Sequence, residues 1–378
     1  MDGQNMQTPP AQSRGLTGPR RATPYSRLTV IGMGSWGTAL AATAARAGCD
    51  TRIWGRRTDL ARSMAETGEN IDHLPGIKLP PTLRPTSDLR EALEGTEAVL
   101  LVTPSHTLRD VARSMRDFLP AGVPLALCCK GIERGTGYLL SHVVEEELPG
   151  HPVGALSGPT FATETALGHP TAATVAFNFS HHDRIEPEKA PAARLALTMQ
   201  TDAFRPYVSD DLVGVEVGGA VKNVIAIACG MMTGAGFAEN TRAALITRGM
   251  DEMKFLAEAL GGRRETVTGL SGAGDLTLTC SSTTSRNMAL GTQLGRGLAR
   301  EECFDGKPVV VEGEVNAVSV VDLARRLGVS MPICEAVHAV LHEGAPLTAT
   351  FQQLWAAPIE GEPRALDLFL HPHEGDPA

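Results

Sequence analysis

The stretch Leu28–Leu40, LTVIGMGSWGTAL, constrains the fold of this chain more than any other. Its first residues, Leu28–Ile31, form a short apolar, β-branched run that predicts a buried strand. The alanine-rich segment from Ala39 predicts a helix that stops at Gly48. Three glycines in the pattern G-x-G-x-x-G lie between the two elements: Gly32, Gly34 and Gly37. A strand, a glycine turn and a helix in this order predict a unit that binds a dinucleotide.

Each glycine of this turn has its own physical role. The first allows a tight turn, the second lets a pyrophosphate approach the backbone, and the third lets the helix pack close to the strand. The N-terminus of the helix adds free N–H groups and a partial positive charge, which suit a phosphate. A βα turn without a ligand is the alternative, because glycine turns are common; the strand and the helix around this one favour cofactor binding.

The end of the next strand-like run bears on which dinucleotide binds. In folds that select NAD, an acidic residue ends this strand and holds the ribose 2′-hydroxyl. Here the run Asp50–Gly55 is followed by Arg56 and Arg57, and Asp59 is expected to cap the next helix. Two arginines at this place favour a 2′-phosphate, and therefore NADP. The alternative is a solvated pair of surface arginines.

Strand-like and helical patterns alternate through the first half of the chain. The further runs typical of strands are Ala98–Val102, Val123–Cys129, Val153–Leu156, Thr171–Phe177 and Ala203–Tyr207. Helical patterns lie at Leu108–Phe118 and Tyr138–Leu148, and the polar segment Ser180–Ala190 is expected to be an exposed loop. The alternation predicts the α/β class, with a doubly wound parallel sheet that carries helices on both faces.

The strand ends in such a sheet mark where a ligand binds. Ligands of doubly wound sheets lie outside the carboxyl ends of the strands. Four loops follow these ends: residues 32–37, Thr103–Ser105, the segment at Lys130, and Ser157–Thr160. We expect these loops to converge on one cleft.

The character of the sequence changes near Asp211, where strand-like runs stop and helical patterns take over. A chain of 378 residues is long enough for two domains. We expect a dinucleotide-binding domain at residues 28–211 and a second, all-helical domain at residues 212–360. Residues 1–27 are expected to form a disordered tail, and residues 361–378 a polar tail with weak helical content around Ala365–Leu370.

Composition excludes several classes of function. The net charge of −9 argues against non-specific binding of nucleic acid, and 4% aromatic residues argue against stacking on single strands. The seven cysteines are scattered without C-x-x-C or Cys/His ligand spacing, which indicates reduced thiols in a cytoplasmic protein and no metal site. The polar N-terminus lacks the apolar core of a secretion signal; its arginines also fit a transit peptide, but Asp2 and four prolines argue against one.

A second chemical centre lies in Val217–Ala238, a long apolar segment with one charged residue, Lys222. Five glycines and the near-central lysine argue against a transmembrane span and favour a helix buried in an α domain. Burial disfavours an ammonium group and lowers its pKa, which would make Lys222 a useful proton donor or acceptor. The alternative is a lysine whose aliphatic stem reaches solvent.

Two further stretches carry polar groups suited to a small anionic ligand. Gly269–Asp275, GLSGAGD, is expected to be a glycine-rich loop that ends in an acid. Ser285, Arg286 and Asn287 stand at the start of a predicted helix, where an arginine and free N–H groups suit a phosphate. Ordinary capping by Ser285 next to a surface arginine is the alternative.

Eight separated stretches together carry a family resemblance. In chain order they are GMGSWGTALA, CKGIE, SGPTFA, GVEVGGAVKNVIAIACG, NTRAALITRG, GAGDLTLTC, SRN and VVEG, within residues 28–360. This series resembles that of bacterial NAD(P)-dependent glycerol-3-phosphate dehydrogenases. The resemblance implies a Rossmann-type N-terminal domain, an all-helical C-terminal domain and an active site between them. It implies reversible hydride transfer between NADPH or NADH and the C2 of sn-glycerol 3-phosphate, with dihydroxyacetone phosphate as the ketone, for phospholipid synthesis.

The resemblance also implies roles for residues at matching positions. Lys222 takes the place of the catalytic acid or base, Lys130 that of a residue near both substrate and cofactor, and Asp275 that of an acid on the substrate side. The other substrate-binding positions are Gly158, Thr160, Ser285, Arg286 and Asn287. The cofactor-binding positions are Gly32, Gly34, Ser35, Trp36, Gly37, Arg56, Arg57, Lys130, Ala162, Arg286, Val310 and Glu312. Thr160 stands where many members have serine, and the segment around residues 181–189 is longer than usual. A homodimer is a further implication.

Two competing hypotheses remain at this stage. A related dehydrogenase that acts on a β-hydroxyacid or on ketopantoate shares the glycine turn and a lysine in a helical domain, but it lacks the phosphate cluster near Ser285. A non-catalytic protein that senses NADP would have no need of Lys222.

Overall fold

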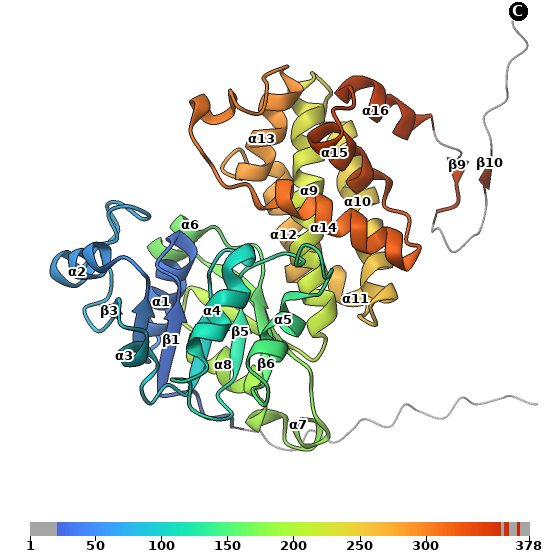
Figure 1. Cartoon of the computed structure of the whole chain (residues 1–378). Helices are drawn as coiled ribbons and strands as arrows, with labels where there is room; N and C mark the ends of the chain where they lie inside the picture. Colours follow the sequence, from blue (N-terminus) through green and yellow to red (C-terminus); the bar gives the residue numbers. More distant parts are fainter. Residues whose placement is uncertain (1–20, 357–358, 363–368, 371–378) are drawn as a thin grey trace, which may run out of the picture.

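The computed structural model of the chain describes residues 21–356, 359–362 and 369–370. Figure 1 shows an N-terminal domain built on one sheet and, above it, a C-terminal domain of helices. A long helix, α9 (Leu212–Gly234), runs from the sheet domain up through the middle of the helical domain.

One eight-stranded sheet organises the N-terminal domain, in the order β3-β2-β1-β4-β5-β6-β7-β8. The strands are β1 (Arg27–Ile31), β2 (Asp50–Trp54), β3 (Arg84–Thr86), β4 (Ala98–Leu101), β5 (Leu125–Leu127), β6 (Val153–Ser157), β7 (Thr171–Phe177) and β8 (Phe204–Ser209). All neighbouring pairs are parallel except β6 and β7, which are antiparallel. The predicted doubly wound sheet is confirmed, although the antiparallel pair and the short polar strand β3 were not predicted.

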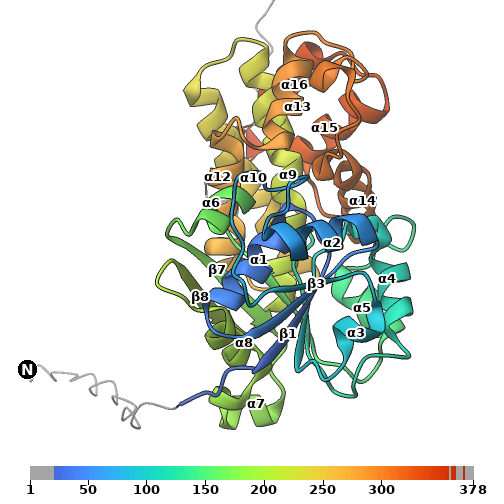
Figure 2. The same ribbon diagram turned by 90° about the vertical axis from the view of Figure 1, so that its left-hand side faces the viewer.

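Helices cover both faces of this sheet, and each face buries its own apolar core. On one face, α1 (Ser35–Arg46) and α8 (Pro191–Met199) pack against strand residues such as Val30. On the other face, α3 (Leu89–Leu93), α4 (Leu108–Met115) and α5 (Leu140–Glu147) pack against residues such as Ile31. Figure 2 shows α8 and α5 on opposite sides of the sheet. The remaining helices of this domain are α2 (Thr58–Thr67), the 3₁₀ turn Ser105–Thr107, α6 (Ala162–Leu167) and α7 (His181–Ile185).

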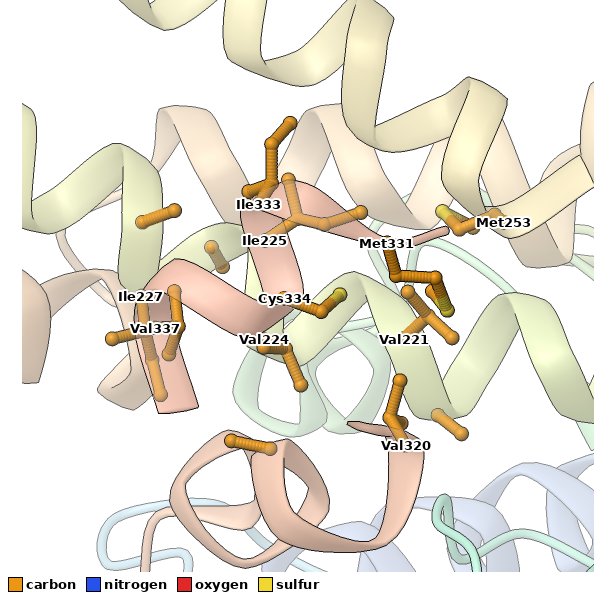
Figure 3. Close-up of a cluster of buried hydrophobic side chains, with 14 of the residues drawn as sticks. Val221, Val224, Ile225, Ile227, Met253, Val320, Met331, Ile333, Cys334 and Val337 are labelled. Atoms are coloured by element: carbon orange, nitrogen blue, oxygen red, sulfur yellow. The ribbon is translucent and has the colours of Figure 1, made fainter. Parts of the chain in front are cut away.

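The C-terminal domain is helical and is built around α9. Its other helices are α10 (Glu239–Ala259), α11 (Arg264–Val267), α12 (Asp275–Ser281), α13 (Arg286–Gly295), α14 (Glu312–Leu327), α15 (Pro332–His342) and α16 (Leu347–Trp355). Figure 3 shows Val221 and Val224 of α9 among Met253 of α10, Val320 of α14 and Cys334 of α15. By length and apolar composition α9 resembles a membrane span, but 94% of its most apolar window is buried inside the protein. The prediction of a buried core helix is therefore confirmed.

Several local predictions need correction. The segment Ser180–Ala190 is not only a loop: Ser180 and Asp183 form a capping box that starts α7, and a 3₁₀ turn follows at Pro187–Lys189. Its polar residues look like a loop in the sequence because capping uses the same side chains. The glycine-rich stretch expected to be a loop is a π-helical turn, Leu270–Gly274, that leads directly into α12.

The tails also differ from expectation where the structure describes them. Tyr25 is buried, its N–H donates to the Thr198 hydroxyl at 2.8 Å, and the Arg194 guanidinium lies 4.0 Å from its ring centre. The ordered chain therefore begins before Leu28, and residues 1–20 lie outside the described part. At the other end, β10 (Phe369–Leu370) pairs with β9 (Ile359–Glu360) and is a strand, whereas the rest of the predicted weak helix lies outside the described residues.

Candidate active site

The glycine turn between β1 and α1 is packed at two positions and open at one. A Cβ at Gly32, which has a φ of +127°, would lie 2.6 Å from the Val102 carbonyl oxygen, and a Cβ at Gly37 would overlap the Gly32 carbonyl oxygen. A Cβ at Gly34 would meet nothing within 4 Å. Gly32 and Gly37 are thus needed for folding, while Gly34 leaves room beside the N-terminus of α1. This is the cradle that a pyrophosphate requires.

A loop between α2 and β3 braces this turn. Asn70 is fully buried, and its amide donates to the Met33 carbonyl oxygen at 2.9 Å and to the Thr38 hydroxyl at 2.8 Å. The Ser35 hydroxyl donates to the His73 carbonyl oxygen at 2.9 Å. Trp36 packs against the apolar residues of the same loop. Ser35 and Trp36 therefore lie at the mouth of the turn and hold it in place.

The two arginines after β2 are both exposed, as a contact with a 2′-phosphate requires. Arg57 is the N-cap residue of α2, and Asp59 lies in the first turn of that helix, which corrects the expected capping role of Asp59. The Arg57 guanidinium binds the carboxylates of Asp59 and Asp72 at 2.5 Å each. A phosphate at this place would compete with these two carboxylates for Arg57.

The centre of the site is one buried carboxylate that binds two ammonium groups. The Nζ atom of Lys222 on α9 donates to Oδ1 of Asp275 at 2.9 Å, and Nζ of Lys130 donates to Oδ2 at 2.5 Å. Lys222 also donates to the hydroxyl of Thr279, one turn along α12, at 2.8 Å. The Lys222 side chain is only 7% exposed, so it does not reach solvent along its stem. Its burial within α9 is the arrangement expected of a proton-transfer lysine.

Charge and burial act in opposite directions on this centre. Burial lowers the pKa of Lys222, and the neighbouring Lys130 ammonium lowers it further, although Asp275 opposes both effects. Burial by itself would raise the pKa of Asp275, but the ammonium groups of Lys130 and Lys222 outweigh it and lower that pKa. Asp275 is therefore ionised at neutral pH, and Lys222 gives up its proton more readily than a lysine in water.

The four predicted loops do converge. A Cβ at Gly32 would contact Val102 and Thr103 at the end of β4, and a Cβ at Gly131 would lie 3.2 Å from the Ser105 hydroxyl. Lys130 and Ser157, which follow β5 and end β6, line one small cavity. Beyond Ser157, the Thr160 hydroxyl donates to the Gly158 carbonyl oxygen at 3.2 Å, and Ala162 is the first residue of α6.

The three residues of the predicted phosphate cluster, Ser285, Arg286 and Asn287, differ in exposure and in hydrogen-bond partners. Arg286 is exposed and makes no hydrogen bond or ion pair with the described part of the chain, whereas Ser285 is the N-cap of α13 and its hydroxyl accepts from the Met288 N–H at 3.3 Å. The Asn287 amide is already engaged: it donates to Asn223 at 2.9 Å and accepts from the Gly313 N–H at 2.9 Å. Arg286 is thus the most available of the three groups for an anion.

The hydrogen bonds that begin at Asn287 extend through Asn223 toward two further predicted cofactor positions, Glu312 and Val310. The Asn223 amide donates to the carboxylate of Glu312, the first residue of α14, at 3.1 Å. Val310, two residues earlier, is exposed. Asn223 and Thr279 are polar neighbours of the centre that the sequence analysis did not single out; their spacing from Lys222 and Asp275 on the same helices is the signal that would have found them.

Among the described residues, no group of three or more His, Cys, Asp or Glu side chains is arranged to hold a metal ion. The acid of the centre binds two lysines instead.

Two family models match this chain, one after the other. The model described as "NAD-dependent glycerol-3-phosphate dehydrogenase N-terminus" matches residues 27–183, and the one described as the C-terminus of the same enzyme matches residues 211–352. The chain belongs to the NAD-dependent glycerol-3-phosphate dehydrogenase family. The resemblance inferred from the eight motif stretches is thereby confirmed.

Relatives within the family agree over most of their length. The glycerol-3-phosphate dehydrogenase [NAD(P)+] of Rhodospirillum rubrum is 47% identical over 89% of this chain and 93% of its own. That of Maricaulis maris is 43% identical over 89% of this chain and 98% of its own. The crystal structure of glycerol-3-phosphate dehydrogenase from Coxiella burnetii is 38% identical, with a TM-score of 0.79 over 89% of this chain and 99% of that one.

A member of the rival class shares only the fold with this family member. A ketopantoate reductase of the PanE/ApbA family from Ralstonia eutropha is 17% identical, with a TM-score of 0.55 over 84% of this chain and 97% of its own. The fold by itself therefore does not separate the two classes, and the site residues must do so.

Proposed function

We propose that this protein catalyses the reversible reduction of dihydroxyacetone phosphate to sn-glycerol 3-phosphate with NADPH or NADH, as a step of glycerophospholipid synthesis. The observation that carries the proposal is the pair of ammonium groups on buried Asp275, close to the strand ends of a dinucleotide-binding sheet. Carbonyl reduction builds negative charge on the carbonyl oxygen, and fixed cations stabilise that charge in a site with little water.

In this proposal each residue of the centre has a separate role. The bound nicotinamide supplies the hydride. Lys222 Nζ donates a proton to the carbonyl oxygen and, in the reverse direction, removes it; Asp275 and Thr279 orient the ammonium through their hydrogen bonds. Lys130 polarises the same oxygen from the sheet domain. The lowered pKa of Lys222 makes its proton easier to transfer.

We assign the substrate phosphate to the N-terminus of α13. Arg286 is exposed there and has no partner in the described part of the chain, and free N–H groups at the start of a helix suit an anion. Ser285 contributes through its capping role, and Asn287 orders the start of α14 through Gly313. Gly158 and Thr160 are assigned to the substrate from the opposite domain.

We assign the cofactor to the turn at Gly34, with its adenosine end toward Arg56 and Arg57. The open space at Gly34 supports a pyrophosphate at this turn, and the exposed arginines support NADP over NAD. The further assigned contacts are Gly32, Ser35, Trp36, Gly37, Lys130, Ala162, Arg286, Val310 and Glu312.

One assay tests the function and the cofactor together. Oxidation of NADPH and of NADH is followed with dihydroxyacetone phosphate and, as the control substrate, with ketopantoate. We expect turnover of dihydroxyacetone phosphate with both cofactors and no turnover of ketopantoate. At low cofactor concentration, the reaction should be faster with NADPH than with NADH. Turnover of ketopantoate but not of dihydroxyacetone phosphate would favour a ketopantoate reductase. Binding of NADPH without turnover of either substrate would favour a sensor.

Three further properties belong to the proposal. We propose that the boundary between the two domains lies between residues 211 and 212, supported by the end of β8 at Ser209 and the start of α9 at Leu212. A cytoplasmic location is supported by seven free cysteines, and fractionation of cells tests it. We also propose a homodimer, which light scattering on the purified protein tests directly.

A further inference from the structure

Glu216 is a buried carboxylate on α9 that the mechanism above does not use. Its Oε1 accepts from the Ser141 N–H at 2.9 Å, and its Oε2 accepts from the Ser141 hydroxyl at 2.6 Å. Both residues are buried, and Ser141 lies in the first turn of α5. A helix of the sheet domain and the central helix of the helical domain are therefore joined by one doubly bonded side chain.

Along α9, Glu216 is followed by the seat of Lys130 and then by Lys222. Three residues after Glu216, a Cβ at Gly219 would lie 3.1 Å from Cγ and 3.4 Å from Cδ of Lys130. Lys222 is the i+3 neighbour of Gly219 and lies about 120° around the helix from Glu216. The position of α9 along its axis, relative to the sheet domain, thus determines the positions of the Lys130 and Lys222 side chains.

A small cavity connects these groups. It has a volume of about 10 Å³ and is lined by residues that include Lys130, Ser157, Glu216 and Gly219. The Ser157 hydroxyl is buried and has no hydrogen-bond partner in the described part of the chain. The space suits a single water, for which Ser157 and Glu216 provide polar partners. Glu216 and Lys130 therefore line the same small cavity.

We propose that Glu216 is a positioning residue for the reduction described above: by binding Ser141 it fixes α9 against the sheet domain, so that Lys130 and Lys222 meet on Asp275. The kinetic part of this inference rests on the proposed function. The anchoring part rests on the contacts alone.

The anchor depends on pH. Burial raises the pKa of Glu216 to about 7, partly offset by the hydrogen bonds from Ser141. The other titratable groups around it are Glu145 on α5, and Cys129 and Lys130 after β5. Burial makes the anchored Glu216 carboxyl bind its proton more tightly than a released, solvated glutamate would, so protonation favours the anchored state. The anchor is thus tight below about pH 7 and weakens as the buried carboxyl ionises above it.

The test compares Glu216→Gln, Glu216→Ala and Ser141→Ala with the wild type between pH 6 and pH 9. Wild-type kcat/KM for dihydroxyacetone phosphate should fall above about pH 7. Glu216→Gln is neutral at every pH and can still bond Ser141, so it should keep activity within several-fold at pH 7 and lose this alkaline limb. Glu216→Ala should lose roughly 10- to 100-fold in kcat/KM, with the KM for NADPH within a few-fold of wild type. Ser141→Ala should add little to Glu216→Ala in the double variant, because the two share one contact.

Glu252→Gln is the matched control. Glu252 is also a buried glutamate that accepts two hydrogen bonds, from the N–H groups of Ile333 and Cys334, but it lies within the helical domain. Its variant should lower the melting temperature and leave the pH profile unchanged. An alkaline limb in Glu216→Gln equal to that of the wild type, or wild-type kcat/KM in Glu216→Ala, would overturn the proposal.

A second measurement does not depend on activity. Acetic anhydride labels exposed lysines, and mass spectrometry of the Lys130 peptide gives the rate. Loss of the anchor should speed labelling of Lys130 several-fold in Glu216→Ala, or in Ser141→Ala if the Glu216→Ala variant does not fold. Unchanged labelling would refute the anchor. If the wild type reduces no dihydroxyacetone phosphate, the proposed function fails while labelling still decides the anchor.

Discussion

Lys130 and Lys222 come from different domains and bind opposite oxygens of the same carboxylate, at 2.5 Å and 2.9 Å. Because Asp275 carries one negative charge, the trio has a net positive charge when both lysines are protonated. A cationic centre suits an anionic substrate and an oxygen on which negative charge develops. This relationship between two lysines is the basis of the first two predictions.

Lys222→Met should abolish turnover without preventing cofactor binding. Methionine keeps the apolar stem and removes the ammonium group, so kcat should fall roughly 10²- to 10⁴-fold, the range of general acid–base catalysis. NADPH affinity, measured by quenching or transfer of cofactor fluorescence, should change by a few-fold at most. Lys254→Met, which alters a lysine on α10 that pairs with Asp251, is the control and should keep full activity. Full turnover in Lys222→Met would refute the mechanism.

Asp275→Asn should destabilise the protein because it leaves two lysines without their shared carboxylate. Breaking a buried pair in this way costs about 3–5 kcal/mol in the free energy of unfolding. Since the folded-state pKa of Asp275 is lowered from 3.8, its contribution to stability is present above pH 3.8 and is lost as the pH falls through the lower value. The difference between wild type and variant in urea unfolding should therefore shrink in strong acid.

The double variant Lys222→Met with Asp275→Asn is the control for this prediction. It removes both members of the buried pair, so it should recover part of the lost stability. A double variant less stable than Asp275→Asn would mean that the carboxylate does not act through Lys222.

The sequence was most informative where function depends on neighbours along the chain. The glycine turn is a local pattern, and the packing of Gly32 and Gly37 with the open space at Gly34 follows its expected division of roles. Lys222 was recognisable because it is the one charged residue in the apolar segment Val217–Ala238. Both signals come from residues that lie close together along the chain, so one sequence is enough to detect them.

The rest of the site depends on contacts between residues far apart in the chain. The pairing of Asp275 with both lysines and the bond from Asn287 to the Gly313 N–H join separate elements. No periodicity encodes such contacts, because they follow from how the helices pack. The π-helical turn before Asp275 was also missed, since its glycines resemble a loop although they serve close packing against α9 and α11.

Arg286→Ala should weaken substrate binding selectively. Arg286 is exposed at the N-terminus of α13 and has no partner in the part of the chain that the structure describes. Loss of a charged hydrogen bond to a phosphate should raise the KM for dihydroxyacetone phosphate roughly 10- to 100-fold, and the KM for NADPH much less. Arg296→Ala, at the other end of the same helix, is the control. Equal effects on both KM values would remove Arg286 from the phosphate site.

Asp72→Asn should increase the preference for NADPH. Arg57 is bound by Asp59 and Asp72, and the 2′-phosphate must displace such carboxylates to reach it. Exposed ion pairs are weak, so the KM for NADPH should fall by a factor of only about 2 to 5 while that for NADH stays unchanged. Arg57→Ala should have the opposite effect on NADPH. Parallel changes for both cofactors would place Arg57 away from the 2′-phosphate.

Alanine substitutions at two glycines of the β1–α1 turn should separate cofactor binding from folding. A Cβ at Gly37 would overlap the Gly32 carbonyl oxygen, so Gly37→Ala should fold poorly or melt many degrees lower, as expected of a close backbone contact. A Cβ at Gly34 would meet nothing within 4 Å, so Gly34→Ala should keep its melting temperature within a few degrees. It should nevertheless lose NADPH affinity at least tenfold, because its methyl group occupies the space through which the pyrophosphate approaches the backbone. Thermal melts and cofactor titrations on the same preparations distinguish the two effects, and wild-type NADPH affinity in Gly34→Ala would show that the pyrophosphate does not bind at this turn.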